Sequence, residues 1–161
     1  MSAHARCPVV VVRGEPRVTD PVVVGVDDSE AAGLVLSFAF EQAAVRGVPV
    51  RAVHAWSPPE GRDLLCETNL QAVAEERGRL EAVVGCWRRR FPGVPVSAEV
   101  AVGSPGEVLA QAATGAQLVV AGARSRRALR LALRPSVGRH LLHRARCSVA
   151  LISRAQAAIR F

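Results

Sequence analysis

Five short apolar runs alternate with longer amphipathic segments along this chain, and this alternation constrains the fold more than any other feature. The runs cover residues 21–26, 48–55, 94–102, 118–122 and 147–152. The first run, PVVVGV, is apolar at nearly every position, as expected of a strand buried on both faces. Strands that alternate with helices form a parallel sheet through right-handed crossovers. The sequence therefore predicts an α/β fold, a parallel five-stranded open sheet with helices on both faces.

Helix signals occupy the segments between these runs. Ser29 is expected to be the N-cap of a helix that ends at about Arg46, before Gly47. Further helices are predicted over residues 67–90, 105–115 and 136–143, and the helix at 105–115 starts after Ser104. The positions expected on the apolar faces of the first two helices are Leu36, Phe40, Ala43, Ala44, Leu70, Val73, Leu80, Val84, Trp87 and Phe91.

Length and hydropathy set the limits of the domain organisation. The 161 residues, 50% of them hydrophobic, are enough for one ordinary core. No apolar run approaches the length of a membrane span, and the run 8–12 is too short for a signal-peptide core. We therefore expect a cytoplasmic protein with an N-terminal extension at 1–20, one domain at 21–154 and a tail at 155–161.

The cysteines and histidines do not indicate a metal site. Four cysteines lack the close pairs of metal ribbons, so free and mostly buried thiols are expected. His140, His143 and Cys147 have a spacing that could gather ligands at a helix end. No fourth ligand follows close in sequence, and Cys147 begins an apolar run. No metal is expected, except Mg accompanying a nucleotide.

The chain is strongly basic, with a net charge of +7 carried entirely by arginine. Such a charge attracts polyanions in general. Proteins that read nucleic acids usually add stacking aromatic residues or a recognition helix, but aromatic residues make up 4% of the chain and tyrosine is absent. Nucleic acid is therefore not expected as a specific partner, and neither is a membrane.

The segment 118–136 has the layout of a phosphate cradle. An apolar run delivers Gly122 into a loop that ends at a helix-start signal, Ser136, and helix N-termini offer unpaired N–H groups to anions. Ser125 and Pro135 stand at two loop positions where a backbone cradle favours glycine, and proline has no N–H. We expect Arg124 to contact phosphate and most of the other loop arginines to be solvated. The five loop arginines are Arg124, Arg126, Arg127, Arg130 and Arg134.

Several segments together resemble a universal stress protein domain. They are VVVGVDDS, VHAW, GSPGEVL, VVAGARS and RPSVGRHLLHRARCSVALI, and they occur in the family's order across residues 21–152. The resemblance implies a Rossmann-like fold of the adenine nucleotide alpha hydrolase type. Members that bind ATP carry glycine, two residues, glycine, nine residues, then glycine and serine or threonine. The matching positions here are Gly122, Ser125, Pro135 and Ser136.

The same resemblance implies the remaining site residues. Asp27 matches the acidic residue that contacts the nucleoside, Ala55 a position lining the base pocket, and Val137 the residue after the phosphate serine. Asp27 also has a physical case, because a carboxylate at a strand's carboxyl end can accept hydrogen bonds from ribose hydroxyls. A capping or turn role for Asp27 before the first helix is the alternative.

The altered loop determines the expected function. Each lost neutral hydrogen bond weakens binding by about 0.5–1.5 kcal/mol. We therefore expect a stress-response regulatory domain, not an enzyme, with weak or absent binding of ATP or AMP. One alternative is a nucleotide-independent dimerisation or scaffolding domain. The other is a phosphate-ester hydrolase, for which His54 is the nearest candidate base, although a histidine in a buried strand usually packs.

One strand-like segment occurs twice. ARCPVVVV at 5–12 repeats ARCSVALI at 145–152 in residue type and register, as if the last strand of a preceding domain were retained. Final strands of universal stress proteins often pair antiparallel across a two-fold axis. By this resemblance, Val9 to Val12 should pair antiparallel beside Cys147 to Ile152 at the sheet edge. The pairing would form a pseudo-dimer within one chain or a homodimer between two, with residues 14–21 as linker.

Overall fold

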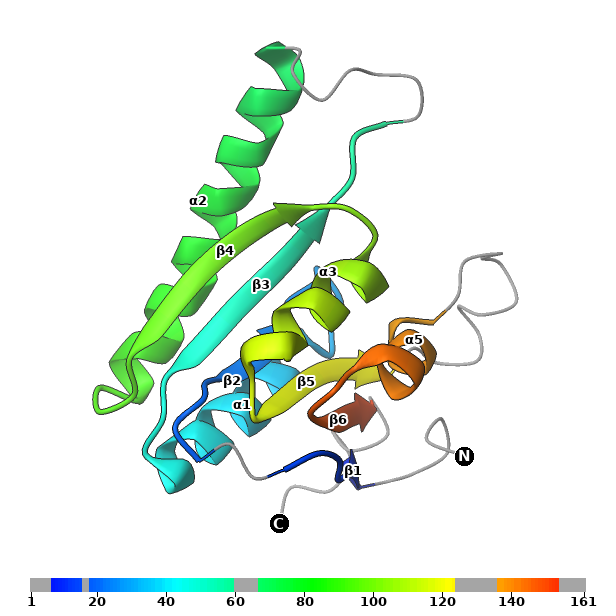
Figure 1. Ribbon diagram of the computed structural model, residues 1–161. Coiled ribbons are helices and arrows are strands. Elements are labelled where there is room, and N and C mark those ends of the chain that lie inside the picture. Colours follow the sequence, from blue (N-terminus) through cyan, green and yellow to red (C-terminus); the bar gives the residue numbers. More distant parts are fainter. Residues whose placement is uncertain (1–6, 16–17, 60–66, 124–135, 154–161) are drawn as a thin grey trace.

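The computed structural model describes residues 7–15, 18–59, 67–123 and 136–153, and these build one sheet of six strands. The strand order is β1-β6-β5-β2-β3-β4 (Figure 1). Strands β2 to β6 are parallel, whereas β1 runs antiparallel to β6 at the edge. The strands are β1 (Val9–Val11), β2 (Val22–Gly25), β3 (Val50–Trp56), β4 (Val96–Val102), β5 (Leu118–Ala123) and β6 (Ser148–Ser153). The predicted fold class is confirmed, including the antiparallel edge strand.

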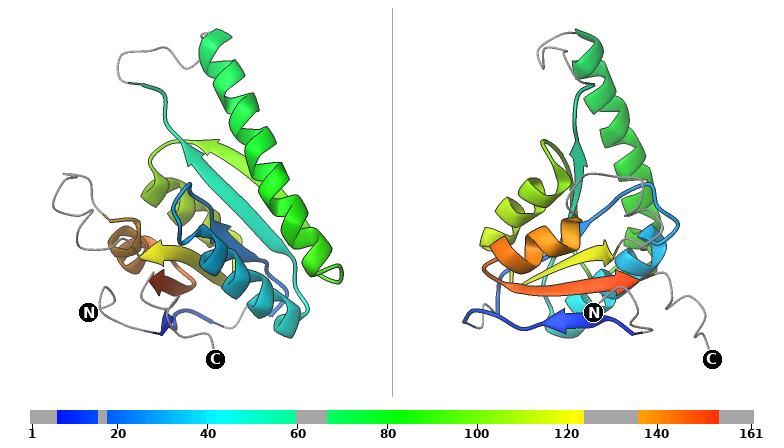
Figure 2. Two further views of the ribbon diagram at one scale, coloured as in Figure 1. Left: turned by 180° about the vertical axis from the view of Figure 1, so that it is seen from behind. Right: turned by 90° about the vertical axis from the view of Figure 1, so that its right-hand side faces the viewer.

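Helices cover both faces of the sheet. Helices α1 (Ala32–Arg46) and α2 (Glu67–Arg90) pack on one face, and α3 (Pro105–Ala112) and α5 (Val137–Arg144) pack on the other. The right-hand view of Figure 2 shows the sheet between these two layers. A 3₁₀ turn, η2 (Ala113–Gly115), ends α3 at the predicted glycine. No helix in the described part of the chain has the length and apolar character needed to cross a membrane.

The two-sided burial explains why the strands read as continuous apolar runs. Along β2, Val22 and Val24 pack into the core beneath α1 and α2, while Val23 faces the core beneath α3 and α5. All three valines are fully buried. A strand with a helix layer on each side has no solvent-facing position, so alternation between apolar and polar residues is absent.

The first helix starts later than the sequence predicts. Ser29 was expected to cap it, but α1 begins at Ala32, and Ala31 occupies the N-cap without a side-chain bond. The Ser29 hydroxyl instead donates to Asp27 Oδ1 at 2.6 Å. A hydroxyl bonded to a nearby carboxylate stabilises a local turn and no longer caps the helix. The predicted stop is confirmed, because Gly47 adopts a φ of 65°.

Several predicted burial positions are wrong. Ala44 is exposed because the buried face of α1 is centred on Leu36 and Phe40. Leu70, in the first turn of α2, is 56% exposed, and Figure 1 shows that α2 extends past the ends of β3 and β4. The expectation of mostly buried thiols also fails, since Cys7 and Cys86 are exposed whereas Cys147 is buried.

The edge strand lies where the sequence predicts it, antiparallel beside β6. Val9 pairs with Leu151, Val10 with Ala150 and Val11 with Val149, all within one chain. Val12, expected in the strand, lies beyond it and is 81% exposed. The edge of β6 is therefore covered by a segment about 140 positions earlier in the sequence. The division of the chain at residues 20 and 154 stays a prediction.

Candidate functional site

The strand order reverses between β2 and β5. From β2 the chain proceeds through β3 and β4 on one side, and then returns to add β5 and β6 on the other. In parallel sheets, the carboxyl ends of strands at such a reversal leave a crevice where ligands bind. A cleft lies at this point, with about 550 Å³ of open space when the solvent at its mouth is included. It is lined by Gly25, Val26, Asp27, Val53, His54, Ala55, Pro105, Leu109, Ala121, Gly122 and Val137.

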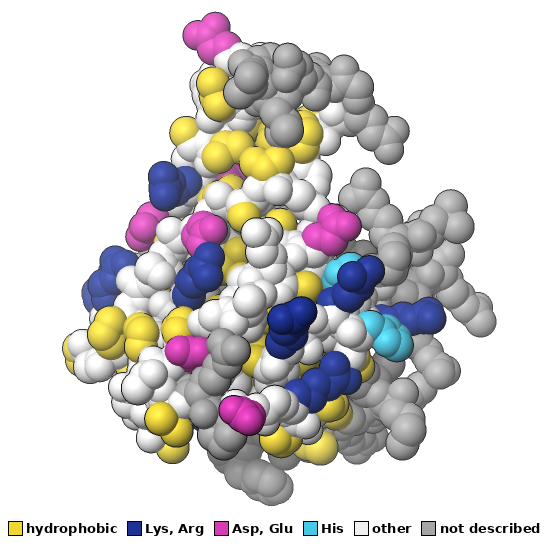
Figure 3. Space-filling view, in the orientation of Figure 1, with side chains coloured by type: hydrophobic (Ala, Val, Ile, Leu, Met, Phe, Trp, Pro, Cys, Tyr) yellow, Lys and Arg dark blue, Asp and Glu magenta, His cyan; other side chains and the backbone are white. Residues whose placement is uncertain are grey.

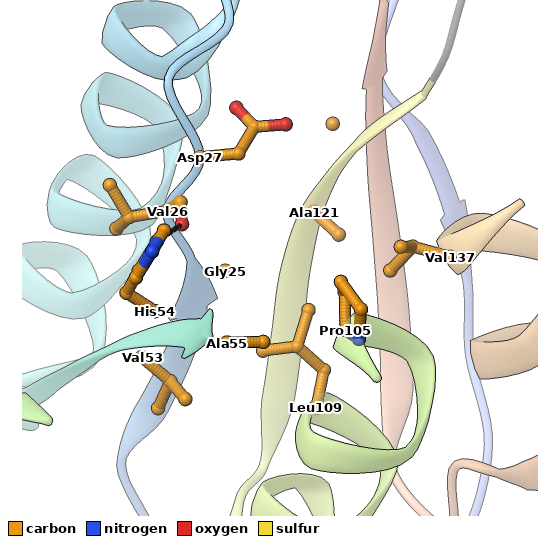
Figure 4. Close-up of a pocket in the computed structure, with 11 residues that line it drawn as sticks. Gly25, Val26, Asp27, Val53, His54, Ala55, Pro105, Leu109, Ala121 and Val137 are labelled. Carbon is orange, nitrogen blue, oxygen red and sulfur yellow. Dashed lines mark hydrogen bonds between the residues drawn. The ribbon is translucent and has the colours of Figure 1, made fainter. Parts of the chain in front are cut away.

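Asp27 is the acidic residue of this cleft (Figure 4). It lies two residues past the end of β2 and is exposed. Its Oδ1 accepts two hydrogen bonds from Ser29, from the backbone N–H at 3.1 Å and from the hydroxyl at 2.6 Å. No described residue donates to Oδ2. The turn therefore fixes one oxygen of the carboxylate, and the other can accept a hydrogen bond from a ligand.

His54 anchors the backbone just before Asp27. Its Nδ1 lies 2.9 Å from the Val26 carbonyl oxygen, as the dashed line in Figure 4 marks. Because a carbonyl only accepts, Nδ1 carries the proton in this bond, and this assigns the tautomer of the neutral ring. The Val26 N–H in turn donates to the Val53 carbonyl at 2.9 Å. Val26 is thus tied to β3 through both its backbone groups.

The other ring nitrogen of His54 faces α2. Its Nε2 lies 3.8 Å from Glu76 Oε2, and both side chains are less than one-fifth exposed. Glu76 Oε1 also accepts a hydrogen bond from Arg79 at 2.7 Å. These side chains border a second hollow of about 370 Å³ between the β2–α1 turn and α2. The second hollow shares Val26, Asp27 and His54 with the cleft.

The glycines of the cleft have different roles. A Cβ at Gly25 would lie 2.5 Å from the Leu109 side chain, so the glycine lets α3 approach the end of β2. A Cβ at Gly122 would make an ordinary 3.7 Å contact with Val35, and Gly122 has no positive φ. Packing of the described residues therefore requires glycine at Gly25 but not at Gly122.

Ser136 lies at the N-terminus of α5. It is the N-cap residue, and its hydroxyl oxygen accepts a hydrogen bond from the Arg139 N–H at 3.2 Å. Val137, the next residue, lines the cleft. The start of α5 therefore borders the cleft on the side opposite β3, and the N-terminus of α3 borders it through Pro105.

The structure brings four of the seven predicted site residues into one cleft: Asp27, Ala55, Gly122 and Val137. Ser136 adjoins them in the chain. Arg124 and Ser125 lie outside the described residues, as do Pro135 and the other loop arginines. The binding roles of all seven stay predictions.

Sequence reasoning missed Gly25, Pro105 and Leu109 as cleft residues. All three belong to the segments that carry the family resemblance, but nothing in their residue types indicates a binding site. His54 was considered only as a catalytic base. Among the described residues, no group of three His, Cys, Asp or Glu side chains is placed to hold a metal ion. His140, one of the residues considered for a metal, packs instead against Gly106.

The family model and the curated relatives that match this chain indicate the same protein family. The model of the universal stress protein family matches residues 19–153. A universal stress protein of Mycobacterium tuberculosis is 39% identical over 153 residues, which cover 91% of this chain and 51% of the relative. The chain therefore spans about half the length of the curated relatives it matches.

Solved structures have the same fold. The universal stress protein from Archaeoglobus fulgidus in complex with dAMP is 28% identical, with a TM-score of 0.60, and the match covers 84% of this chain and 98% of that one. A universal stress protein in complex with cAMP has a TM-score of 0.63 at 20% identity, over 84% of this chain and 97% of that one. The second likeness is informative about the fold alone.

Proposed function

Because the chain belongs to the universal stress protein family, we propose that it is a stress-response regulatory domain whose cleft binds an adenine nucleotide weakly. One observation carries this proposal. At the reversal of strand order, Asp27 holds one carboxylate oxygen in a turn with Ser29 and keeps the other available beside an apolar cleft. The related protein from A. fulgidus was solved with dAMP, which supports an adenine nucleotide as the ligand class.

The cleft has surfaces suited to the parts of a nucleotide. Asp27 Oδ2 would accept a hydrogen bond from a ribose hydroxyl. Ala55, Leu109 and Val137 offer apolar surface to a base. Gly122 and the start of α5 would face the phosphates, where helix N–H groups favour an anion.

Weak binding follows from the sequence of the loop. Ser125 and Pro135 replace two glycines of the family's motif, and Pro135 has no N–H to donate. Arg124 would compensate in part, because a guanidinium makes charge-assisted bonds to phosphate. We therefore expect ATP to bind only slightly more tightly than AMP. Mg would be bound only through the phosphates of the nucleotide.

Calorimetric titration with ATP, AMP and cyclic AMP tests the proposal. We expect binding weaker than about 1 μM, corresponding to a binding free energy of smaller magnitude than roughly 8 kcal/mol. Asp27→Ala should abolish the heat of binding. Asp28→Ala is the matched control, because this neighbouring carboxylate is exposed but does not line the cleft. The proposal fails if no nucleotide gives heat, or if both variants bind like the parent protein.

The chain is proposed to bind the nucleotide without turning it over. His54 uses Nδ1 on the Val26 carbonyl, and its Nε2 faces Glu76, so the ring serves to position backbone and helix. We expect purified protein incubated with ATP and Mg to release no phosphate above the buffer blank. Release that disappears in the variant His54→Gln would instead identify the hydrolase.

A nucleotide-independent association domain is the second candidate, and the pairing of β1 with β6 favours it. The three residue pairs between these strands reproduce within one chain the kind of antiparallel edge contact expected of a pseudo-dimer. In this case β1 of one chain would pair with β6 of another, and this exchange of strands, not the cleft, would mediate the biological interaction. A calorimetric blank combined with a stable folded domain would support this candidate.

A further inference from the structure

The charges of this chain are separated along its sequence. All 14 acidic residues lie between Glu15 and Glu107, and residues 108–161 contain none. This C-terminal third carries 10 of the 21 arginines, a formal charge of +10, whereas residues 1–107, with 11 arginines, carry −3. Such an asymmetry between parts of a chain indicates interaction with a polyanion. The net charge of +7 conceals it.

The structure places part of this charge on one exposed surface, formed by Arg139, Arg144 and Arg146, which we call the α5 surface. The first two side chains belong to α5, the third follows it, and all three are exposed. His143 is exposed on the same helix. Figure 3 shows basic and histidine side chains gathered around the position of α5, on the lower right of the molecule.

Three arginines on other surfaces of the described structure, Arg51, Arg79 and Arg88, have acidic partners. Arg51 contacts Glu99 at 2.6 Å, and Arg79 contacts Glu76 at 2.7 Å. The three arginines of the α5 surface form no ion pair with a described residue. Glu107 lies in the first turn of α3, the helix packed against α5, and it forms no ion pair with these arginines. The positive field of the α5 surface is therefore little compensated.

From this arrangement we propose that the α5 surface binds the phosphodiester backbone of a nucleic-acid duplex without reading its sequence. A guanidinium fork fits two phosphate oxygens, and lysine offers only a point charge. Helix α5 has no Phe, Tyr or Trp to stack on bases, so the surface lacks the usual means of recognising a base sequence or a single strand. The proposal does not depend on nucleotide binding in the cleft.

An anionic membrane is a poorer fit for this surface. Helices that lie on membranes insert exposed apolar side chains. On α5, however, Leu141 is fully buried and Leu142 is half-buried, while the exposed positions carry Arg139, His143 and Arg144. The surface thus offers charge without an apolar wedge. A rigid array of phosphates fits it better than a lipid bilayer does.

The affinity should depend steeply on salt. Each phosphate neutralised on duplex DNA contributes about 0.9 to the slope of log K against log salt concentration. Three arginine contacts therefore account for roughly 2.7 of that slope. Contacts to phosphate carry no base information, so duplexes of unrelated sequence should bind equally well.

The test measures fluorescence anisotropy of a labelled duplex of about 20 base pairs with the full chain, without nucleotide, between roughly 50 and 200 mM salt. The variant R139A/R144A/R146A should bind at least tenfold more weakly at the lower salt. The slope of log K against log salt concentration should also be smaller in magnitude by about three. The matched control is R46A/R77A/R89A, which removes the same charge from exposed positions on α1 and α2 whose arginines also form no ion pair with a described residue. Thermal melting of both variants verifies that they are folded.

Each outcome decides the proposal. Selective loss in the α5-surface variant, with equal binding of two unrelated duplexes, supports it. Equal weakening in both triple variants overturns it, because net charge alone would then explain binding. It is likewise overturned if the parent protein leaves the duplex unbound, prefers single strands, or releases the duplex to phosphatidylglycerol vesicles at equal phosphate concentration. Should the α5-surface variant not fold, the three single substitutions, each expected to lower the slope by about one, replace it.

Discussion

At the scale of single residues, the site depends on hydrogen bonds that hold Asp27 in one orientation. Ser29 fixes one carboxylate oxygen, and His54 and Val53 fix the backbone of the preceding residue, Val26. A ligand that bonds to the second oxygen therefore meets a group already ordered by its neighbours. Such preorganisation lowers the entropy lost on binding. It is also why a serine that was expected to cap a helix serves the candidate site instead.

Two substitutions of His54 distinguish what its hydrogen bond contributes to stability from what the size of its ring contributes. His54→Phe keeps a ring but leaves the half-buried Val26 carbonyl without its donor, so the free energy of unfolding should fall by about 1 kcal/mol. His54→Gln restores a donor and should recover most of that loss. Urea unfolding measures both variants. Equal stability of the Phe and Gln variants would show that the hydrogen bond contributes nothing.

At the scale of elements, glycines determine how closely helices approach one another and the sheet. Helix α3 passes so near α5 that a Cβ at Gly106 would lie 2.9 Å from His140 Cγ. Similarly, a Cβ at Gly138 would lie 3.2 Å from the Leu151 side chain of β6. These short approaches bring the N-termini of both helices to the cleft, where Pro105 and Val137 form part of its lining.

Two glycine-to-alanine substitutions in helices should have opposite effects. Gly106→Ala forces the ring of His140 away and should lower the free energy of unfolding by about 1–3 kcal/mol. Gly78→Ala, in the middle of α2 with nothing within 4 Å of the added Cβ, should raise it by about 0.5–1 kcal/mol. Chemical denaturation compares the two. A stabilising effect at Gly106 would mean that α3 and α5 are not closely packed.

At the scale of the whole molecule, the main feature is the covered edge of the sheet. Strand β1 covers β6 within the chain. It therefore forms hydrogen bonds with N–H and C=O groups of β6 that would otherwise be unpaired at the sheet edge. The coverage is short, and Val10 on it is 46% exposed. An equivalent strand from a second chain could occupy the same position, which would exchange the strands of two molecules.

Truncation tests what β1 does. Deleting residues 1–13 removes β1, exposes the edge of β6, and should both lower the melting temperature and raise the molar mass in solution through pairing of two chains. Deleting only residues 1–6 keeps the strand and serves as the control. Light scattering and thermal melting give the two readouts. If the longer deletion changes neither mass nor melting temperature, the strand has no capping role.

The sequence by itself determined the elements and their order. Runs such as VVVGV and the stops at Gly47 and Gly115 are local signals, and each strand and helix of the described core was predicted within a few residues. The repeated segment also predicted that β1 pairs antiparallel with β6. Local periodicity suffices here because a strand buried on both faces has few sequence patterns available to it.

Only the tertiary structure decided which side chains meet. Leu109 reaches the cleft because glycine at Gly25 lets α3 come close, and His54 bonds Val26 because β3 lies beside β2. Likewise, exposure of Leu70 follows from the length of α2 relative to the strands. Contacts of this kind join residues far apart in the sequence, and they depend on the distances between packed elements. A pattern read along one chain contains the periodicity of each element but not those distances.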